Sequence, residues 1–152
     1  MEMSMDKAIG SASVRLSKKL TRYINLQLKP FSITTEQWSV LRTLSESNDI
    51  SQKELSERAD KDQATLTKIL DLLEKNKFIE RVQNPSDRRS FLIKITQKGA
   101  QLVKEVTPYL EEVFAKITDS IQAEKLAIYK ETVLSLENNI EMLLEENKQK
   151  EG

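Results

Sequence analysis

The chain has 152 residues, of which 38% are hydrophobic and 32% charged, with only 3 glycines and 3 prolines. This composition is typical of one helix-rich globular domain, alone or with a helical extension. The chain has no cysteine and no histidine, which excludes disulfides, thiol redox sensing, metal sites built from Cys or His, and Ser–His nucleophile pairs. No two of the remaining groups stand out as a general acid and base, so we expect neither an enzyme nor a bound cofactor or metal.

The formal net charge is zero, but the charges are unevenly distributed. Residues 51–100 carry 11 basic and 8 acidic side chains, whereas residues 101–152 carry 6 basic and 11 acidic ones. Nucleic-acid binding needs only a local basic face, which the central segment can supply. No apolar run approaches the roughly 18 residues of a membrane-spanning helix, and the N-terminus lacks the apolar middle of a signal peptide. We therefore expect a cytoplasmic protein without a membrane partner.

Hydrophobic residues at three- and four-residue spacing predict the first two helices. Residues 6–29 form the first, and Pro30 is expected to end it. The second opens at "TTEQW", where Thr34 and Gln37 have the spacing of a capping box, in which each side chain accepts a hydrogen bond from the other's backbone N–H. This helix is expected to end at "SNDI", residues 47–50. One face of it carries Trp38, Leu41 and Leu44.

A short helix and a longer one follow, joined by the three-residue connection "DKD". Ser51 and Glu54 have the capping-box spacing at the start of the short helix, "SQKELSERA". Asp60 is expected to adopt the left-handed conformation in the turn, and Asp62 is expected to cap the longer helix, "QATLTKILDLLEKN". Two helices with so short a connection indicate a helix-turn-helix. The residues that they are expected to bury are Leu55, Ala59, Leu66, Ile69, Leu70 and Leu73.

A β-hairpin is predicted directly after these helices. "FIERVQ" (78–83) and "SFLIKI" (90–95) form the strands, "NPSD" forms the turn, and Arg88 and Arg89 lie at the tip. A helix-turn-helix followed by a hairpin is the winged helix arrangement, with the hairpin as the wing. Two adjacent like charges gain nothing from folding there, so their position favours contact with a polyanion. The alternative is a solvated turn that contains an Asp–Arg ion pair.

Two long helices are predicted after the hairpin. Thr96 caps the first, in which Pro108 should cause a kink or a restart. The second runs over residues 122–148 with apolar residues at heptad-like spacing. A small winged helix cannot cover these apolar seams as well as the first helix, so we expect a homodimer, with a bundle within one chain as the alternative. The fold class is therefore mainly α (α+β): a winged helix-turn-helix domain with a helical dimerisation domain formed by the N- and C-terminal helices.

The segments "TTEQWSVLRTL", "ISQKELSERADKDQATLTKILDLLEKNKFIERV", "NPSDRRSFLIKIT" and "KG" occur in an order and spacing that resembles the MarR family of bacterial transcriptional regulators. The Asp-Arg-Arg wing followed by "LIKITQKG" is the most specific of these elements. The resemblance implies a winged helix homodimer that binds double-stranded DNA at a pseudo-palindromic operator, usually as a repressor and often released by a small-molecule effector. It implies three parts: an N-terminal dimerisation helix (1–30), a winged helix DNA-binding domain (31–98) and C-terminal dimerisation helices (99–152).

The resemblance also implies which residues contact DNA. The longer helix should enter the major groove by its N-terminal end, where Gln63 can read adenine and Thr65 can contact a thymine methyl or a phosphate. The family's Asp-x-Arg spacing places Arg89 in the minor groove, with Asp87 orienting its guanidinium through a bidentate pair, while Arg88 contacts a phosphate. The predicted DNA-binding residues are Ser51, Gln52, Lys61, Asp62, Gln63, Ala64, Thr65, Thr67, Lys68, Asp87, Arg88 and Arg89.

Three positions depart from the family pattern. Asp60 and Lys77 stand where the family usually has glycine, and Lys61 stands where it usually has an apolar residue. We expect Asp60 or Asn76 to adopt the left-handed conformation that the missing glycines would have supplied.

The family's ligand pocket lies between the first, second and fifth helices. By position Tyr23, Trp38 and Arg42 are its candidates, although an aromatic on an apolar helix face is more often part of the core. The lack of cysteine argues against peroxide sensing, and the lack of histidine argues against zinc sensing. Two other functions remain as alternatives: a winged helix that binds an acidic protein instead of DNA, and an enzyme whose site consists only of carboxylates.

Overall fold

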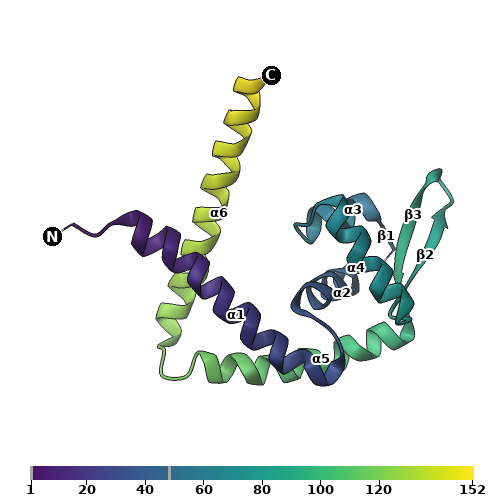
Figure 1. Ribbon diagram of the computed structural model, residues 1–152, viewed down its shortest axis with the longest axis horizontal. Helices are drawn as coiled ribbons and strands as arrows, with labels where there is room; N and C mark the ends of the chain where they lie inside the picture. The colour runs from purple at the N-terminus through teal and green to yellow at the C-terminus, as the bar shows by residue number, and fades with distance from the viewer. Residues whose placement is uncertain (1, 48) are drawn as a thin grey trace. The chain divides into compact units, whose positions relative to one another are not determined.

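A computed structural model of the protein describes residues 2–47 and 49–152, so Asn48 of the predicted "SNDI" turn lies outside the described residues, as does Met1. The chain divides into two compact units, Met1–Val113 and Phe114–Gly152. Figure 1 shows the helices and the small sheet. Within the described residues, no helix is long and apolar enough to cross a membrane.

The predicted first helix is confirmed in extent but consists of three helical types. A π-helical segment, η1 (Asp6–Ser11), leads into α1 (Ala12–Leu28), and a 3₁₀ turn, η2 (Lys29–Phe31), follows. Pro30 lies in this turn, where the α-helix has already ended, because proline lacks the N–H that an α-helix needs. Ser32 then adopts a left-handed conformation (φ 59°) and reverses the chain.

The second helix, α2 (Thr35–Glu46), begins with the predicted capping box. The Gln37 N–H donates to Thr34 Oγ1 at 3.2 Å, and the Thr34 N–H donates to Gln37 Oε1 at 3.1 Å. Asn25 of α1 accepts a third hydrogen bond, from the Thr35 N–H at 2.8 Å. This bond ties the end of α1 to the start of α2. The buried residues of α2 are Trp38, Val40, Leu41 and Leu44.

The short helix, α3 (Gln52–Arg58), has only half of its predicted capping box. Ser51 Oγ accepts a hydrogen bond from the Glu54 N–H at 3.1 Å, as expected. The Glu54 carboxylate does not return to Ser51 but pairs with Arg58 at 2.7 Å, one helical turn later. A charge-assisted pair between residues four apart is the stronger interaction for this carboxylate. The full box is therefore corrected to a simple N-cap.

Both helices of the helix-turn-helix end in the same way. After α3, the Lys61 N–H donates to Ser56 O at 2.9 Å around left-handed Asp60 (φ 53°), as predicted. After α4 (Gln63–Lys75), the Phe78 N–H donates to Leu73 O at 2.9 Å. These are Schellman motifs, which need a left-handed residue just past the helix cap.

At the end of α4 this residue is Lys77 (φ 66°), not the predicted Asn76. Asn76 has φ −85° and still donates its N–H back to Leu72 O, at 3.1 Å. Helical hydrogen bonding therefore continues to Asn76, and the left-handed position falls on Lys77. Lys77 occupies the place where a glycine is usual.

The sheet has the order β1-β3-β2 and is antiparallel throughout. β1 (Ile50–Ser51) was not predicted, because two residues are too few to show an alternating pattern. β2 (Ile79–Asn84) and β3 (Asp87–Ile95) extend closer to the turn than expected, so only residues 85–86 remain between them. Asp87, Arg88 and Arg89 are therefore the first residues of β3 rather than part of the turn.

Two long helices complete the chain. α5 (Gln97–Ile117) is capped as predicted, since the Gly99 N–H donates to Thr96 Oγ1 at 3.1 Å. The helix continues across Pro108. The predicted alternative, in which a new helix begins at this proline, is therefore wrong. α6 (Ala123–Glu151) extends three residues past the predicted end at 148. Its exposed large apolar side chains are Ile128, Tyr129, Leu134, Ile140, Met142, Leu143 and Leu144.

One hydrophobic core holds the first unit together. Its fully buried side chains come from α1, α2, α3, α4, the hairpin and α5, which shows that the helix-turn-helix, the wing and the start of α5 share one core. They are Leu28, Val40, Leu41, Leu44, Leu55, Leu66, Leu70, Leu73, Ile79, Ile93 and Val106.

Gly99 lets the start of α5 touch the base of the hairpin. A Cβ at this position would overlap the Phe78 carbonyl oxygen and would lie 2.8 Å from Cγ1 of Ile95. The overlapping atom belongs to the backbone, so it cannot move aside by a rotamer change.

We expect Gly99→Ala to lower the free energy of unfolding by about 1–3 kcal/mol, the usual cost of forcing extra volume into a packed site. Urea denaturation measures this change. Gly10→Ala is the matched control, because a Cβ there meets only the end of the Asp6 side chain, at 3.1 Å. Equal stabilities of the two variants would contradict the close approach at Gly99.

Candidate nucleic-acid interface

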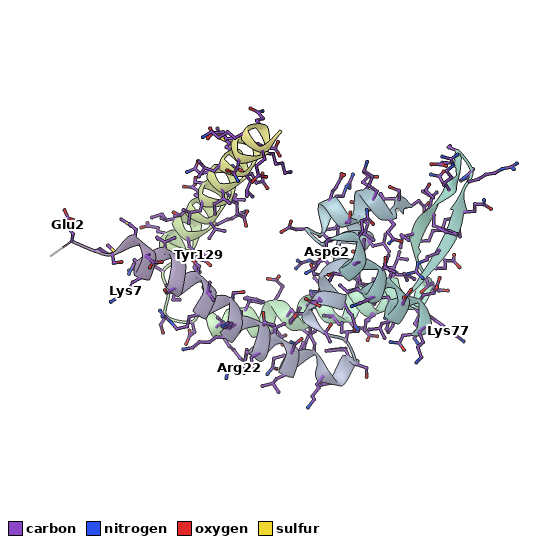
Figure 2. The ribbon with its side chains drawn as sticks, turned by 45° about the horizontal axis from the view of Figure 1, so that its top comes forward. Glu2, Lys7, Arg22, Asp62, Lys77 and Tyr129 are labelled. Atoms are coloured by element: carbon purple, nitrogen blue, oxygen red, sulfur yellow. The ribbon has the colours of Figure 1, made fainter. Side chains whose placement is uncertain are left out.

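Helix α4 buries one face and leaves the opposite face in solvent. The buried side is made by Leu66, Ile69, Leu70 and Leu73, as predicted. Ala64, Thr67, Lys68 and Asp71 lie on the exposed side, and Gln63 begins the helix there. Asp62 and Lys77 mark the two ends of this helix (Figure 2). The structure therefore presents the polar residues of α4 together as one surface.

The first turn of α4 is fixed by Asp62. Its Oδ1 accepts a hydrogen bond from the Thr65 N–H at 2.8 Å, and its Oδ2 accepts one from the Thr65 hydroxyl at 2.8 Å. These bonds, the backbone one first, lower the pKa of the Asp62 carboxyl below its ordinary value of 3.8. The predicted cap is confirmed, and it already engages the Thr65 hydroxyl within the protein.

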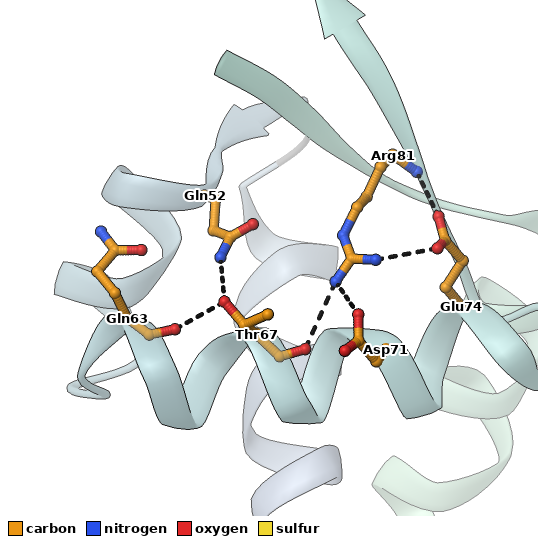
Figure 3. A network of polar contacts seen from close by, with 6 residues as sticks. All are labelled: Gln52, Gln63, Thr67, Asp71, Glu74 and Arg81. Carbon is orange, nitrogen blue, oxygen red and sulfur yellow. Dashed lines mark hydrogen bonds and ion pairs between the residues drawn. The ribbon is translucent and has the colours of Figure 1, made fainter. Parts of the chain in front are cut away.

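A second set of hydrogen bonds joins α3 to α4 (Figure 3). Gln52 Nε2 donates to Thr67 Oγ1 at 2.8 Å, and the same hydroxyl donates to Gln63 O at 2.8 Å. Gln63 Nε2 donates to Ser56 Oγ at 3.4 Å. The structure thus brings Gln52, Gln63 and Thr67 together, but the Thr67 hydroxyl is used to hold the two helices in place.

The wing arginines carry free charges. Arg88 and Arg89 are exposed, and neither has a carboxylate within 4.0 Å among the described residues. The predicted pairing of Asp87 with the Arg89 guanidinium is not formed. Asp87 Oδ1 instead accepts a hydrogen bond from the Arg89 backbone N–H at 3.0 Å, because a carboxylate two residues before an N–H readily closes such a local turn.

The turn itself is held by neighbouring polar groups. Asn84 Nδ2 donates to Ser90 Oγ at 3.1 Å, and the Ser86 N–H donates to Asn84 Oδ1 at 3.0 Å. The backbone of the tip is therefore ordered by its own residues, while the arginine side chains remain available to a partner.

Arg81 is a residue of this region that the sequence interpretation missed. It lies on β2 and forms ion pairs with Asp71 and Glu74 of α4, at 2.8 and 2.9 Å. The signal was present: within "FIERVQ", alternation puts Arg81 on the same side of the strand as buried Ile79. A cation on the inward side of a strand needs an anionic partner.

The three candidates for a ligand pocket differ in their exposure. Trp38 is 5% exposed and its indole Nε1 has no hydrogen-bond partner among the described residues. Tyr23 and Arg42 are exposed. Two concave surfaces of the structure lie elsewhere, one along η1 and α1 and one along α5, and neither is lined by these residues. A pocket at Tyr23, Trp38 and Arg42 stays a prediction.

The lowered pKa of Asp62 has a consequence for stability. A carboxyl whose pKa is lower in the folded state stabilises the fold above the pKa of the unfolded chain and loses this effect as the pH falls through the folded pKa. We expect carbon-detected NMR to give a titration midpoint for the Asp62 carboxyl below 3.8.

The matched variant is Asp62→Asn, which retains a capping oxygen but does not titrate. Its free energy of unfolding should fall less than that of the wild type as the solution is acidified. A midpoint at or above the ordinary value would show that the cap is absent in solution.

A model of the MarR family matches residues 33–91, which run from the start of α2 into β3. Among solved structures, the chain is similar to a mutant MarR from E. coli complexed with operator DNA, with 25% identity over 89% of this chain and 99% of that chain and a TM-score of 0.80. A MarR protein from Peptoclostridium difficile has the same fold, with 20% identity, coverages of 93% and 92%, and a TM-score of 0.83.

The PcaV transcriptional regulator from Streptomyces coelicolor, solved in complex with its natural ligand, also has this fold, with 17% identity, coverages of 91% and 97%, and a TM-score of 0.75. The matched segment includes the whole helix-turn-helix and the tip of the wing, which are the elements that carry the exposed polar surface. Residues 33–91 thus match the MarR family model, and the chain has the fold of solved MarR regulators.

Proposed function

We propose that this protein is a sequence-specific DNA-binding transcriptional regulator, without enzymatic activity, that binds a pseudo-palindromic operator as a homodimer. The observation that carries the proposal is the combination of an exposed polar face on α4 with two wing arginines, Arg88 and Arg89, that have no carboxylate within 4.0 Å among the described residues. The E. coli MarR with which the chain shares 25% identity was crystallised with operator DNA.

In this proposal α4 enters the major groove by its N-terminal end. Gln63, Ala64 and Lys68 are exposed there and can contact base edges and phosphates. Gln63 would give up the 3.4 Å hydrogen bond from its Nε2 to Ser56 Oγ to do so. Asp62 and Thr65 hold the first turn in place, and the methyl group of Thr67 remains available, because only its hydroxyl is engaged by Gln52. Ser51, Gln52 and Lys61 flank this surface and contact the phosphate backbone.

The wing acts on the neighbouring minor groove. Arg89 enters it, since a narrow A·T-rich minor groove has a strongly negative potential that attracts arginine. Arg88 contacts a phosphate. Asp87 accepts a hydrogen bond from the Arg89 backbone N–H and so orders the start of β3. It does not orient the Arg89 guanidinium.

A homodimer gives the protein two copies of this surface. The exposed apolar side chains of α6 need a cover, and a second copy of the chain supplies one. We assign residues 1–30 and 99–152 to dimerisation and residues 31–98 to DNA binding. The half-sites of the operator should then lie roughly one helical turn, about 10 bp, apart. We place the protein in the cytoplasm, acting as a repressor.

A small ligand would release the repressor from DNA. Tyr23, Trp38 and Arg42 are the residues that we assign to its binding. The support is the indole N–H of Trp38, a buried donor without a protein partner among the described residues, which favours a ligand that offers a hydrogen-bond acceptor.

The test is a selection of bound sequences from a pool of randomised duplex DNA at two salt concentrations. The wild type should enrich a palindrome, and its affinity should fall steeply with salt as counterions are released. Arg89→Ala should lower the affinity for the enriched duplex about tenfold, the scale expected for one groove-reading arginine.

Arg58→Ala is the matched control for the loss of one arginine. The Arg58 guanidinium already pairs with Glu54 and donates to Ser47 Oγ, so its removal should leave the affinity nearly unchanged. A folded dimer that enriches no sequence at low salt would refute DNA binding and favour an acidic protein as the partner of the wing.

A further inference from the structure

Arg81 joins the wing to the recognition helix α4 through four hydrogen bonds (Figure 3). Its Nη1 donates to Glu74 Oε1 at 2.9 Å and its Nη2 donates to Asp71 Oδ1 at 2.8 Å. Its backbone N–H donates to Glu74 Oε2 at 3.3 Å. Its Nη2 also donates to the Thr67 carbonyl oxygen at 3.5 Å. One residue of β2 therefore bonds to two acids of α4 that are three residues apart and to the backbone of the same helix.

The position of Arg81 in the sheet gives these bonds their importance. β2 has β3 on one side only, so the backbone N–H groups on its other side belong to a free sheet edge. Glu74 caps one of these groups, at Arg81. On the far side of the hairpin, β1 pairs with β3 at Ile93 and Leu92. Arg81 lies opposite Ile93, so both strands are held at the same level.

Closer to the tip than residues 92–93, the described residues outside the hairpin give it no side-chain hydrogen bond. The side-chain hydrogen bonds of residues 82–91 stay within the hairpin among the described residues. No side chain of this segment is buried. The direction of the tip, where Arg88 and Arg89 begin β3, is thus set where Arg81 holds the strand.

The bonds of Arg81 are stronger than those of an ordinary surface ion pair. Its side chain is 19% exposed, compared with 62% for Asp71 and 43% for Glu74. A planar guanidinium shared between two carboxylates gives directional, charge-assisted hydrogen bonds and loses little freedom when they form. Such a contact fixes an orientation, which a single exposed pair does not.

We propose that Arg81 is a positioning residue that sets the direction of the wing relative to α4, so that Arg89 and α4 engage neighbouring grooves of one DNA duplex together. The contacts of Arg81 are independent of the proposed function, but their consequence for DNA binding rests on it. A wing that is already oriented does not lose conformational freedom on binding, so its arginine contributes its full contact energy. A wing released by loss of Arg81 would contribute less.

The first experiment needs no DNA. Because the chain has no cysteine, Ser86→Cys gives one attachment point for a spin label at the wing tip. In the labelled protein we expect Arg81→Met to increase the mobility of the label, seen as a narrower electron paramagnetic resonance spectrum. Lys75→Met removes one exposed cation from the end of α4 and leaves the bonds of Arg81 to Asp71 and Glu74 in place, so it should leave the spectrum unchanged.

The second experiment measures coupling between Arg81 and the wing arginine on the duplex recovered by selection. In the wild type, Arg89→Ala should lower affinity about tenfold. In an Arg81→Met background the same change should lower it by less than about threefold, because the released wing no longer delivers its arginine. Independent losses that simply multiply, together with an unchanged label spectrum, would overturn the proposal.

A second variant guards against a protein that fails to fold. Asp71→Asn with Glu74→Gln removes the charged acceptors and leaves Arg81 in place, and it should reproduce both the increase in label mobility and the loss of coupling. A wild-type spectrum in this variant would overturn the proposal. If the wild type binds no DNA, the proposed function fails, while the label experiment still decides whether Arg81 positions the wing.

Discussion

The buried face of α4 is the constraint on which the remaining surface depends. Leu66, Leu70 and Leu73 are completely excluded from solvent, and each such side chain would cost about 2–5 kcal/mol to truncate to alanine. A helix cannot rotate about its axis without exposing them. The core therefore decides that the opposite side, with Ala64, Lys68 and Asp71, faces outward. Hydrophobic packing, which carries no information about DNA, determines which polar residues can reach it.

Polar contacts then refine this orientation instead of creating it. A capping or side-chain hydrogen bond contributes about 1 kcal/mol, less than one buried leucine. Their effect is directional: Asp62 fixes the first turn, Gln52 ties α3 to the middle of α4, and Arg81 ties on the wing. These bonds attach α3 and the wing to the same helix, α4.

Local signals in the sequence predicted most of the fold because they act within a few residues. The capping box at Thr34, the cap at Asp62 and the left-handed Asp60 depend only on neighbours three or four positions away. The wrong or missing predictions concern groups that have two possible partners, or partners far away in the sequence. The Glu54 carboxylate could reach either the Ser51 backbone N–H or the Arg58 guanidinium, and it pairs with Arg58. The strand β1 exists only because β3 lies beside it.

The candidate site likewise contains residues that local periodicity predicts and residues whose contacts depend on another element. The exposed face of α4 follows from helical periodicity, so its residues could be named in advance. Strand alternation indicates that Arg81 needs an anionic partner, but the partners Asp71 and Glu74 could not be named in advance. They belong to another element, and their meeting with Arg81 depends on how β2 packs against α4. The free guanidinium of Arg89 was missed for a different reason: its own backbone competes for Asp87 at shorter range.

The turns that frame the reading helix also leave room for change. The chain has only 3 glycines, and in the part of the chain that the structure describes five other residues adopt left-handed conformations, among them Asp60 and Lys77 at the two Schellman motifs. A side chain in this conformation costs about 1 kcal/mol relative to glycine. Glycine at these two positions would raise the melting temperature without altering the exposed face of α4. The thermal tolerance of this regulator can therefore evolve separately from the DNA sequence that it reads.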